Sequence, residues 1–290
     1  LQQSAPDAHA HLLRIFGDIH HELELYGRSL QLHEKSVASA RAFHGKDAYE
    51  TVMAEMQFAG VLREMQRADE GWPLVEHALA VLSKIAPRSP GYAQALSLES
   101  AFLGSKQPQR AVRAGEAAVR LMEELGLQDY RATSARYVYA HALILANDTE
   151  RAVPELRRAA FEFEQLFGAD YIDVAWINTM LAEGLRQLGR LDEARAALQH
   201  AIEIFEKHPE KRATGLAQAR SALSKLLQGM GDWRGSREQV DLAIRDRLQS
   251  SEKAMPTIDQ LRSLRSMLWV EQGSLQEGIT EFLELQRAAP

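Results

Sequence analysis

Apolar residues recur at helical spacing along this chain, and the pattern is clearest over residues 171–207. In the first half of this segment, intervals of three or four positions separate an apolar series: Val174, Ile177, Leu181, Leu185 and Leu188. Such spacing places the series on one stripe of an α-helix. Gly189 follows, where glycine commonly ends a helix, and a second apolar stripe runs from Leu191 to Phe205. The segment is therefore predicted to form two antiparallel helices joined by a short turn.

The two-helix pattern repeats with a nearly constant period. Small residues mark one position in each repeat: Ser29, Gly71, Ala111, Ala152, Ala194, Ser236 and Gly278. The intervals between them are 42, 40, 41, 42, 42 and 42 residues. A second series lies seven positions further on: Ser36, Ala78, Ala118, Ala159, Ala201, Ala243 and Leu285. A period of this size is typical of stacked helical repeats, and small side chains are expected where two helices cross closely.

These observations predict an all-α fold, a right-handed α-solenoid of about seven helix pairs. No stretch alternates polar and apolar residues for long enough to indicate a strand. We expect residues 8–288 to form a single superhelix. Its units are predicted near 8–45, 48–86, 90–126, 128–167, 170–208, 212–251 and 256–288.

Composition narrows the function classes. The net charge of −6 argues against nucleic acid as a direct partner, because nucleic-acid binding favours a basic surface. The absence of cysteine excludes disulfides, thiolate zinc sites and cysteine nucleophiles. No run approaches the roughly 20 apolar residues that a membrane helix needs. The chain begins at Leu1 rather than Met, so we expect a fragment of a longer protein. A cytoplasmic location is expected, or a periplasmic one if the fragment follows a membrane helix.

Residues 173–205, which read DVAWINTMLAEGLRQLGRLDEARAALQHAIEIF, resemble a tetratricopeptide repeat (TPR). The residues that carry the resemblance are one small residue in the first helix, a turn glycine and two alanines in the second helix: Ala182, Gly189, Ala194 and Ala201. The period of about 42 residues and the run from Ala152 to Ala159 resemble the longer kinesin-light-chain type. The resemblance extends from about His9 to Leu285. It implies a TPR superhelix, a fold that hosts many unrelated functions.

The sequence departs from the kinesin-light-chain type at one functional feature. The groove of that type has a pair of asparagines in the first helix of each unit. Here Thr179 and Met180, or Tyr137 and Val138, stand at those places. A cargo-peptide mode that depends on asparagine pairs is therefore not expected.

The opening segment Leu12 to Ile19, which reads LLRIFGDI, resembles the repeat region of large bacterial signalling proteins. In such proteins the repeats follow a Ser/Thr kinase or a winged-helix DNA-binding domain. This resemblance implies an alternative function, that of a ligand- or peptide-sensing regulatory region of a kinase or transcription regulator.

In the TPR fold, the first helix of each unit lines the concave face, which binds partners. We predict the following residues of units two to five on that face: Met53, Met56, Arg63, Leu96, Ser100, Leu103, Tyr137, His141, Ile144, Trp176, Thr179, Glu183 and Arg186. Tyr137 and Trp176 are the expected anchors for an extended peptide or a partner helix. A shift of one residue in the helical register would instead place Tyr137 or Trp176 in the core.

No enzyme chemistry is expected from the remaining residues. The metalloprotease pattern fails, because Leu25 stands where the second histidine would follow His21 and Glu22. Gly104 to Lys106 lacks the upstream glycine and the strand that a phosphate-binding loop needs. The sequence therefore predicts a non-enzymatic, protein- or peptide-binding scaffold with no cofactor and no metal. It is not expected to insert into a membrane, and its terminal units could form a homodimer.

Overall fold

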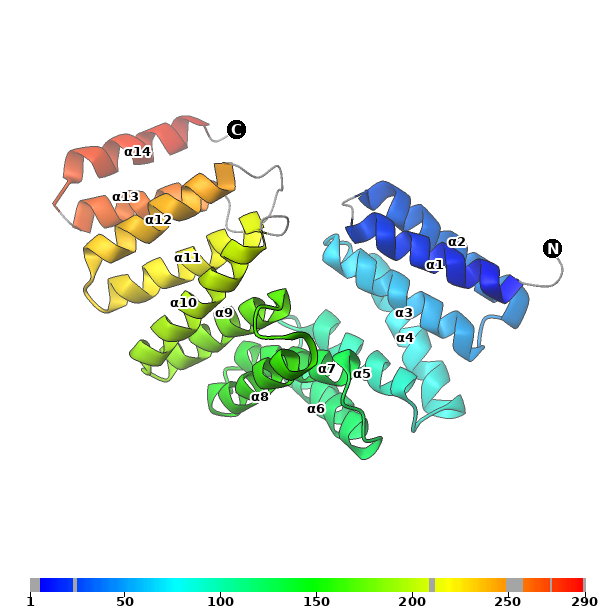
Figure 1. Ribbon diagram of the computed structural model, residues 1–290. Helices are drawn as coiled ribbons and strands as arrows, with labels where there is room; N and C mark the ends of the chain where they lie inside the picture. Colours follow the sequence, from blue (N-terminus) through cyan, green and yellow to red (C-terminus); the bar gives the residue numbers. More distant parts are fainter. Residues whose placement is uncertain (1–5, 23–24, 209–211, 249–257, 272, 289–290) are drawn as a thin grey trace. The chain divides into compact units, whose positions relative to one another are not determined.

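The computed structural model describes residues 6–22, 25–208, 212–248, 258–271 and 273–288. Within these ranges the chain forms fourteen α-helices and no strand, so the predicted all-α fold is confirmed. The helices are α1 (Pro6–Glu22), α2 (Tyr26–His44), α3 (Tyr49–Glu64), α4 (Ala68–Ile85), α5 (Pro90–Leu103), α6 (Pro108–Glu124), α7 (Tyr130–Leu145), α8 (Thr149–Phe167), α9 (Ile172–Gln187), α10 (Leu191–Lys207), α11 (Arg212–Gly229), α12 (Trp233–Leu248), α13 (Ile258–Glu271) and α14 (Leu275–Ala288). Figure 1 shows them in chain order.

Consecutive helices pair through tight turns that the sequence indicates. Gly189, between α9 and α10, has a φ of +72°, a left-handed conformation that glycine adopts without strain. Asn147 and Gln66 occupy the corresponding turns with φ values of +65° and +61°. The amide nitrogen of Arg190 then donates to the carbonyl of Leu185, which closes the end of α9. Each turn directs the chain back along the helix it has just left.

The small residues of the 42-residue series lie where paired helices approach each other. Ala111, Ala152 and Ala194 have no exposed surface. At Gly71, an added Cβ would lie 3.1 Å from the carbonyl oxygen of Ala59 on the preceding helix. The predicted role of small residues at the crossings is therefore confirmed at these positions. The side chain of Leu285 lies outside the described residues.

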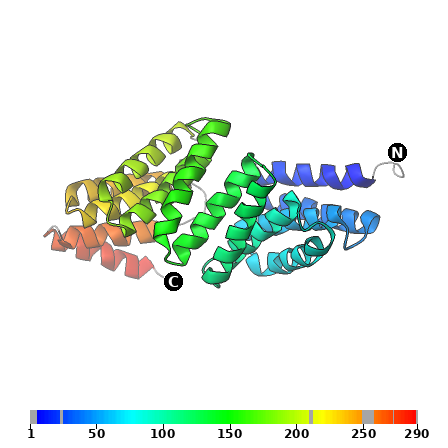
Figure 2. The ribbon, with the colours of Figure 1, turned by 90° about the horizontal axis from the view of Figure 1, so that it is seen from below.

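The contacts divide the chain into two compact units, Leu1–Asn147 and Asp148–Pro290. The N-terminal unit contains α1 to α7, and the C-terminal unit contains α8 to α14. Within each unit, second helices pack against the first helix of the next repeat, as α2 does on α3 and α10 does on α11. Figure 2 shows the same helices from a second direction. The prediction of one superhelix over residues 8–288 stays a prediction.

A cluster of charged side chains joins three helices of the N-terminal unit. Glu55 on α3 has no exposed surface, and its carboxylate accepts hydrogen bonds from Arg41 Nε at 3.0 Å and His77 Nδ1 at 2.6 Å. His77 Nε2 lies 3.0 Å from Asp47 Oδ1. Burial alone would lower the pKa of His77, but hydrogen bonds to Glu55 and Asp47 outweigh it and raise the pKa. Through these two contacts His77 ties α4 to α3 and to the turn before α3.

The pKa of a second histidine of this unit is shifted in the opposite direction. His33 on α2 is 1% exposed, its ring stacks on Phe58 with centroids 6.5 Å apart, and a Cβ at Gly17 would lie 2.8 Å from the ring. Burial lowers the pKa of His33. The charge of Asp18 on α1 opposes this shift, whereas those of Arg14 and His21 reinforce it. His33 is therefore a neutral packing residue between α1 and α3.

We expect the lowered pKa of His33 to make folding sensitive to acid. A base with a lowered folded pKa contributes stability above its unfolded pKa of 6.5, and this contribution is lost as pH falls from 6.5 toward the folded value. Urea unfolding at pH 7.5 and at pH 5 should therefore show a smaller loss of stability in a His33→Phe variant than in the wild type. An equal loss in both proteins would contradict this role. The comparison isolates His33 from His77, whose raised pKa acts in the opposite direction.

Candidate functional site

The first helices of successive repeats contact one another as well as their partners in the repeat. In the N-terminal unit α3 contacts α5 and α5 contacts α7, and in the C-terminal unit α9 contacts α11. Between described second helices such as α4 and α6, contacts of this extent are not found. Helices that approach more closely on one side of a repeat stack lie on its inner side. We call the accessible surface of these first helices the inner face of each unit.

Six predicted residues of the N-terminal unit keep accessible surface. Arg63 and His141 are exposed, and Met53, Leu96, Tyr137 and Ile144 are half-buried. They come from α3, α5 and α7, which are the helices that contact one another. The inner face of this unit thus presents an aromatic ring, aliphatic side chains and two basic groups.

Four predicted inner-face residues are buried, which corrects the sequence analysis. Their exposed fractions are 2% for Met56, 1% for Ser100, 5% for Leu103 and 6% for Thr179. Met56 packs with Val52 and Leu82 in an apolar cluster of α3 and α4. Leu103 is the last residue of α5, and its side chain is buried at the end of that helix. Met56 and Leu103 are core residues.

The two polar residues among these four, Ser100 and Thr179, are directed into the protein. Ser100 lies against α6, where a Cβ at Gly115 would come within 2.9 Å of the Ser100 hydroxyl oxygen. The Thr179 hydroxyl donates a hydrogen bond to the carbonyl of Ala175, at 2.9 Å. Neither hydroxyl is directed at a ligand, so Ser100 and Thr179 do not belong to the site.

His141 is a titratable group on the inner face of the N-terminal unit. Its surface is exposed, yet the surrounding protein partly desolvates the imidazole and lowers the pKa of His141. The charge of Arg63 on α3 lowers the pKa further. A negatively charged group placed beside Arg63 would be attracted to its charge, and the neutral imidazole of His141 can donate a hydrogen bond to the same group.

The inner face of the C-terminal unit combines one aromatic ring with charges of both signs. The half-buried Trp176 stands edge-on to the buried ring of Phe205, with centroids 5.0 Å apart. Glu183 accepts hydrogen bonds from Arg186 Nη2 at 2.6 Å and from Gln187 Nε2 at 2.9 Å. The hydrogen bonds from Arg186 are the main reason that the pKa of Glu183 is lowered. This carboxylate is therefore ionised at neutral pH.

Sequence reasoning missed further polar residues of this face on α11 and α13. The charge of Lys225 acts on Glu183, and Gln228 Nε2 donates to Glu271 Oε2 at 3.0 Å. The 42-residue step was the available signal. Counting 42 positions from Glu183 reaches Lys225, and the same count from Arg186 reaches Gln228.

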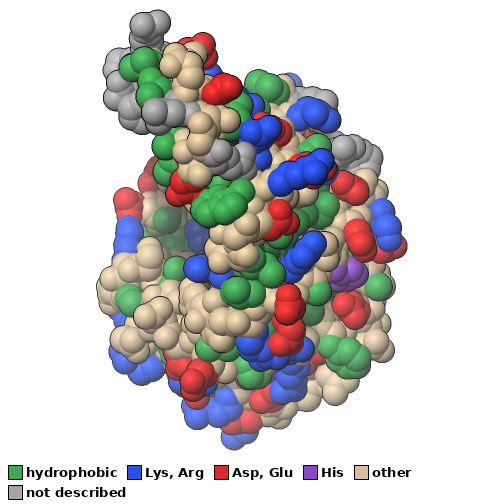
Figure 3. Space-filling view, turned by 90° about the vertical axis from the view of Figure 1, so that its left-hand side faces the viewer, with side chains coloured by type: hydrophobic (Ala, Val, Ile, Leu, Met, Phe, Trp, Pro, Cys, Tyr) green, Lys and Arg blue, Asp and Glu red, His purple; other side chains and the backbone are tan. Residues whose placement is uncertain are grey.

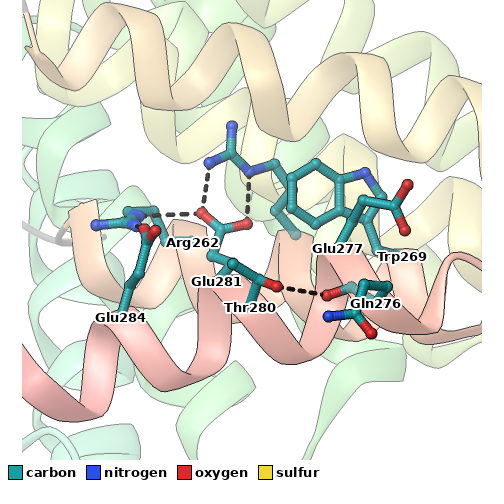
Figure 4. A pocket seen from close by; sticks show the side chains of 8 residues that line it. Arg262, Trp269, Gln276, Glu277, Thr280, Glu281 and Glu284 are labelled. Carbon is teal, nitrogen blue, oxygen red and sulfur yellow. Dashed lines mark hydrogen bonds and ion pairs between the residues drawn. The ribbon is translucent and has the colours of Figure 1, made fainter.

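A depression between α13 and α14 is a second candidate site (Figure 4). Glu281, 4% exposed, accepts from Arg262 Nε at 3.0 Å and from Arg265 Nε at 2.9 Å. Arg265 also lies over the ring of Trp269, 5.1 Å from its centroid, and donates to Asp241 at 3.0 Å. These charges already satisfy one another, so the depression offers no strong attraction to an added ion.

Side chains of different types are mixed on the surface. Figure 3 shows hydrophobic, basic and acidic side chains interspersed on the face that it displays. In the described ranges, no group of three or more His, Cys, Asp or Glu side chains is arranged to hold a metal ion. None of the helices that the structure describes is long and apolar enough to cross a membrane.

Comparison with known protein families finds a match in part of the chain. Residues 130–207 and 173–247 match the tetratricopeptide repeat family. No curated protein matches the chain.

Three solved structures illustrate the similarity. BtubC (BKLC) from P. vanneervenii has a TM-score of 0.65 at 19% identity, over 77% of this chain and 91% of that one. A Rap protein complexed with competence and sporulation factor has a TM-score of 0.67 at 14% identity, over 96% of this chain and 74% of that one. A STAND protein with a tetratricopeptide repeat sensor from Pyrococcus horikoshii has a TM-score of 0.71 at 8% identity, over 97% of this chain and 42% of that one. At these identities the similarity concerns the fold.

Proposed function

We propose that this chain, an array of tetratricopeptide repeats, is a non-enzymatic scaffold that binds a protein or peptide along the inner faces of its first helices. One observation carries the proposal. Side chains with accessible surface follow one another on helices that touch, from Arg63 on α3 to His141 on α7 and, in the other unit, from Trp176 on α9 to Lys225 on α11.

The chemistry of these faces suits a peptide better than a small molecule. A row of shallow contacts on successive helices matches an extended segment, whose side chains reach one helix after another. Tyr137 and Trp176 offer large, stiff aromatic surfaces, which carry much of the affinity at protein interfaces. The charge of Arg63 favours an acidic group on the ligand in the N-terminal unit. Arg186 and Lys225 beside Glu183 favour a polar segment in the C-terminal unit.

The regulatory alternative uses the same faces. Among the similar structures, one is a Rap protein in complex with competence and sporulation factor, and another is described as a repeat sensor within a larger ATPase. A regulatory region would bind its peptide and change its conformation on binding. This alternative is supported if peptide binding changes the solution scattering of the chain, and the plain scaffold is supported if scattering stays constant.

The test is the affinity of peptides selected from a random library on the wild-type protein. We expect Tyr137→Ala and Trp176→Ala each to weaken the selected peptides at least about tenfold, or roughly 1.4 kcal/mol, if that unit holds the peptide. Isothermal titration calorimetry measures the change. Circular dichroism reports whether each variant keeps its helical content.

Matched controls remove an exposed aromatic ring from outside the inner faces. Phe43 at the end of α2 is 52% exposed, and Phe161 on α8 is 60% exposed. Phe43→Ala and Phe161→Ala should leave the affinity unchanged. If the controls weaken the peptide as much as Tyr137→Ala and Trp176→Ala do, the ligand lies elsewhere and the proposed site is wrong.

A further inference from the structure

One glycine of the inner face is not explained by packing. Gly60 lies in the interior of α3, where glycine is destabilising relative to alanine. Close packing explains another helix glycine of this unit, because a Cβ at Gly71 would lie 2.9 Å from the ring of Phe102. At Gly60 an added Cβ would meet no neighbouring helix or side chain within 4 Å. The packing of the protein therefore does not require glycine at this position.

Gly60 occupies a repeat position that carries a large polar side chain on three other first helices. It lies 11 residues before Gly71, the small residue of its own repeat. The same count back from the small residues of later repeats reaches His141, Glu183 and Lys225 on the inner faces of α7, α9 and α11. Gly60 is half-buried, so part of its surface stays accessible. The inner face of α3 therefore has an open space where later repeats present a side chain.

An exposed positive charge stands beside this space. Arg63 lies one turn after Gly60 on α3, and helical side chains lean toward the N-terminus, so Arg63 extends over the turn that contains Gly60. Arg67, four residues further on, pairs with Glu70, whereas Arg63 forms no ion pair with any residue that the structure describes. Burial and then the charge of Arg63 lower the pKa of His141, so the field of this guanidinium reaches α7.

We propose that Gly60 determines which ligands the N-terminal unit accepts, because an acidic side chain of the bound peptide occupies the space above Gly60 and pairs with Arg63. This inference rests on the proposed peptide-binding function and specifies the ligand chemistry at one point of the inner face. A carboxylate fits, because it can accept two parallel hydrogen bonds from a guanidinium. The neutral imidazole of His141 can donate a further hydrogen bond to the peptide. A larger residue at position 60 would fill the space and keep the carboxylate away from Arg63.

Gly60→Ala tests whether the space is free of packing. Alanine favours a helix more than glycine does, and its Cβ would meet no neighbour, so the midpoint of thermal unfolding should rise by about 1–3 °C. Gly71→Ala is the matched control, and its midpoint should fall because the added Cβ meets the ring of Phe102. Circular dichroism measures both midpoints. A fall for Gly60→Ala as large as that for Gly71→Ala would overturn the inference, since packing would then require the glycine.

Larger residues at the same position test the binding role. Gly60→Leu should weaken library-selected peptides at least about tenfold, because the leucine side chain occupies the space of the acidic group. Gly60→Glu should act in the same way, since its own carboxylate lies three residues before Arg63 and pairs with it. Gly27 gives the matched controls: an added Cβ there also meets nothing within 4 Å, but Gly27 lies at the start of α2, outside the inner faces. Gly27→Leu and Gly27→Glu should leave the affinity unchanged in isothermal titration calorimetry.

A double-mutant cycle tests the charge. The selected peptides should contain an acidic residue, and replacing it by its amide analogue should weaken binding to the wild type roughly threefold to tenfold. Arg63→Gln should bind the acidic peptide more weakly than the wild type does, and the same replacement in the peptide should then change little. Equal losses with both proteins would show that the acidic group does not meet Arg63, and the inference would be wrong.

Failure of this inference is distinguishable from failure of the proposed function. Peptides that bind Gly60→Leu and Gly27→Leu equally would overturn the role of Gly60. If Tyr137→Ala or Trp176→Ala still weakens those peptides, binding at the inner faces stands without it. If neither variant weakens them, the proposed function falls as well.

Discussion

Replacing Phe205 by alanine is expected to lower the free energy of unfolding by about 3–5 kcal/mol. Phe205 is fully buried in α10 and contacts both neighbouring first helices. Trp176 of α9 stands on its ring, and a Cβ added at Gly215 of α11 would lie 2.3 Å from a ring atom. Removal of the ring leaves a cavity that three rigid helices cannot fill. Urea unfolding followed by circular dichroism measures the loss.

Phe161→Ala is the matched control for this variant. Phe161 lies on α8 and is 60% exposed, so its removal should change stability by no more than about 0.5 kcal/mol. Because Trp176 rests on Phe205, the variant should also weaken any ligand held by Trp176. A Phe205→Ala protein as stable as Phe161→Ala would show that these helices do not pack as described.

Arg220→Met is expected to cost about 3–5 kcal/mol through a different mechanism, the loss of one ion-pair partner of a buried charge. The Arg220 side chain is 8% exposed, and it pairs with Asp246, which is 7% exposed. Its second terminal nitrogen donates to Glu206 at 2.7 Å, and Glu206 is 48% exposed. Water can solvate Glu206 once the arginine is gone, but it reaches Asp246 poorly. Most of the cost therefore falls on the Asp246 carboxylate.

The double variant Arg220→Met/Asp246→Leu separates this cost from lost packing. Replacing both members of a buried ion pair by apolar side chains of similar size is commonly neutral or stabilising. We expect the double variant to recover most of the stability that the single variant loses, as measured by urea unfolding. If Arg220→Met alone lost less than about 1 kcal/mol, the pair would have to be solvated in solution.

The helices and their pairing could be predicted from sequence because they depend on local spacing. Apolar residues three or four positions apart fix a helical face, and the 42-residue step fixes where each pair begins again. Ala152 and Ala194 could be assigned to helix crossings for the same reason, since a close approach admits no larger side chain. The ion pairs were not predictable. Glu55 and His77, or Arg220 and Asp246, are 22 and 26 residues apart, and no periodicity says which of many charges will meet.

The candidate site was only partly predictable, because a small rotation about the helix axis separates inner-face positions from core positions. One residue advances a helix by about 100°, so the boundary between inner face and core falls between neighbouring side chains. Met56 and Thr179 lie just across that boundary and are buried, whereas Arg63 and His141 remain accessible. Ser100 is buried because Gly115 on α6 has no side chain, and the space beside Gly115 is filled by Ser100. That effect comes from a neighbouring helix and leaves no trace in the spacing of α5 itself.

The most direct measurement of the central claim, that ligands lie along the inner faces, is photo-crosslinking of a library-selected peptide. A photoreactive residue is introduced in place of His141 or Arg186 on the inner faces, and in place of Phe43 or Phe161 outside them. All four positions are accessible, so reactivity alone does not distinguish them. Crosslinks to the peptide from His141 or Arg186, and none from Phe43 or Phe161, are the predicted result. Crosslinks from Phe43 or Phe161 with none from His141 or Arg186 would contradict the account.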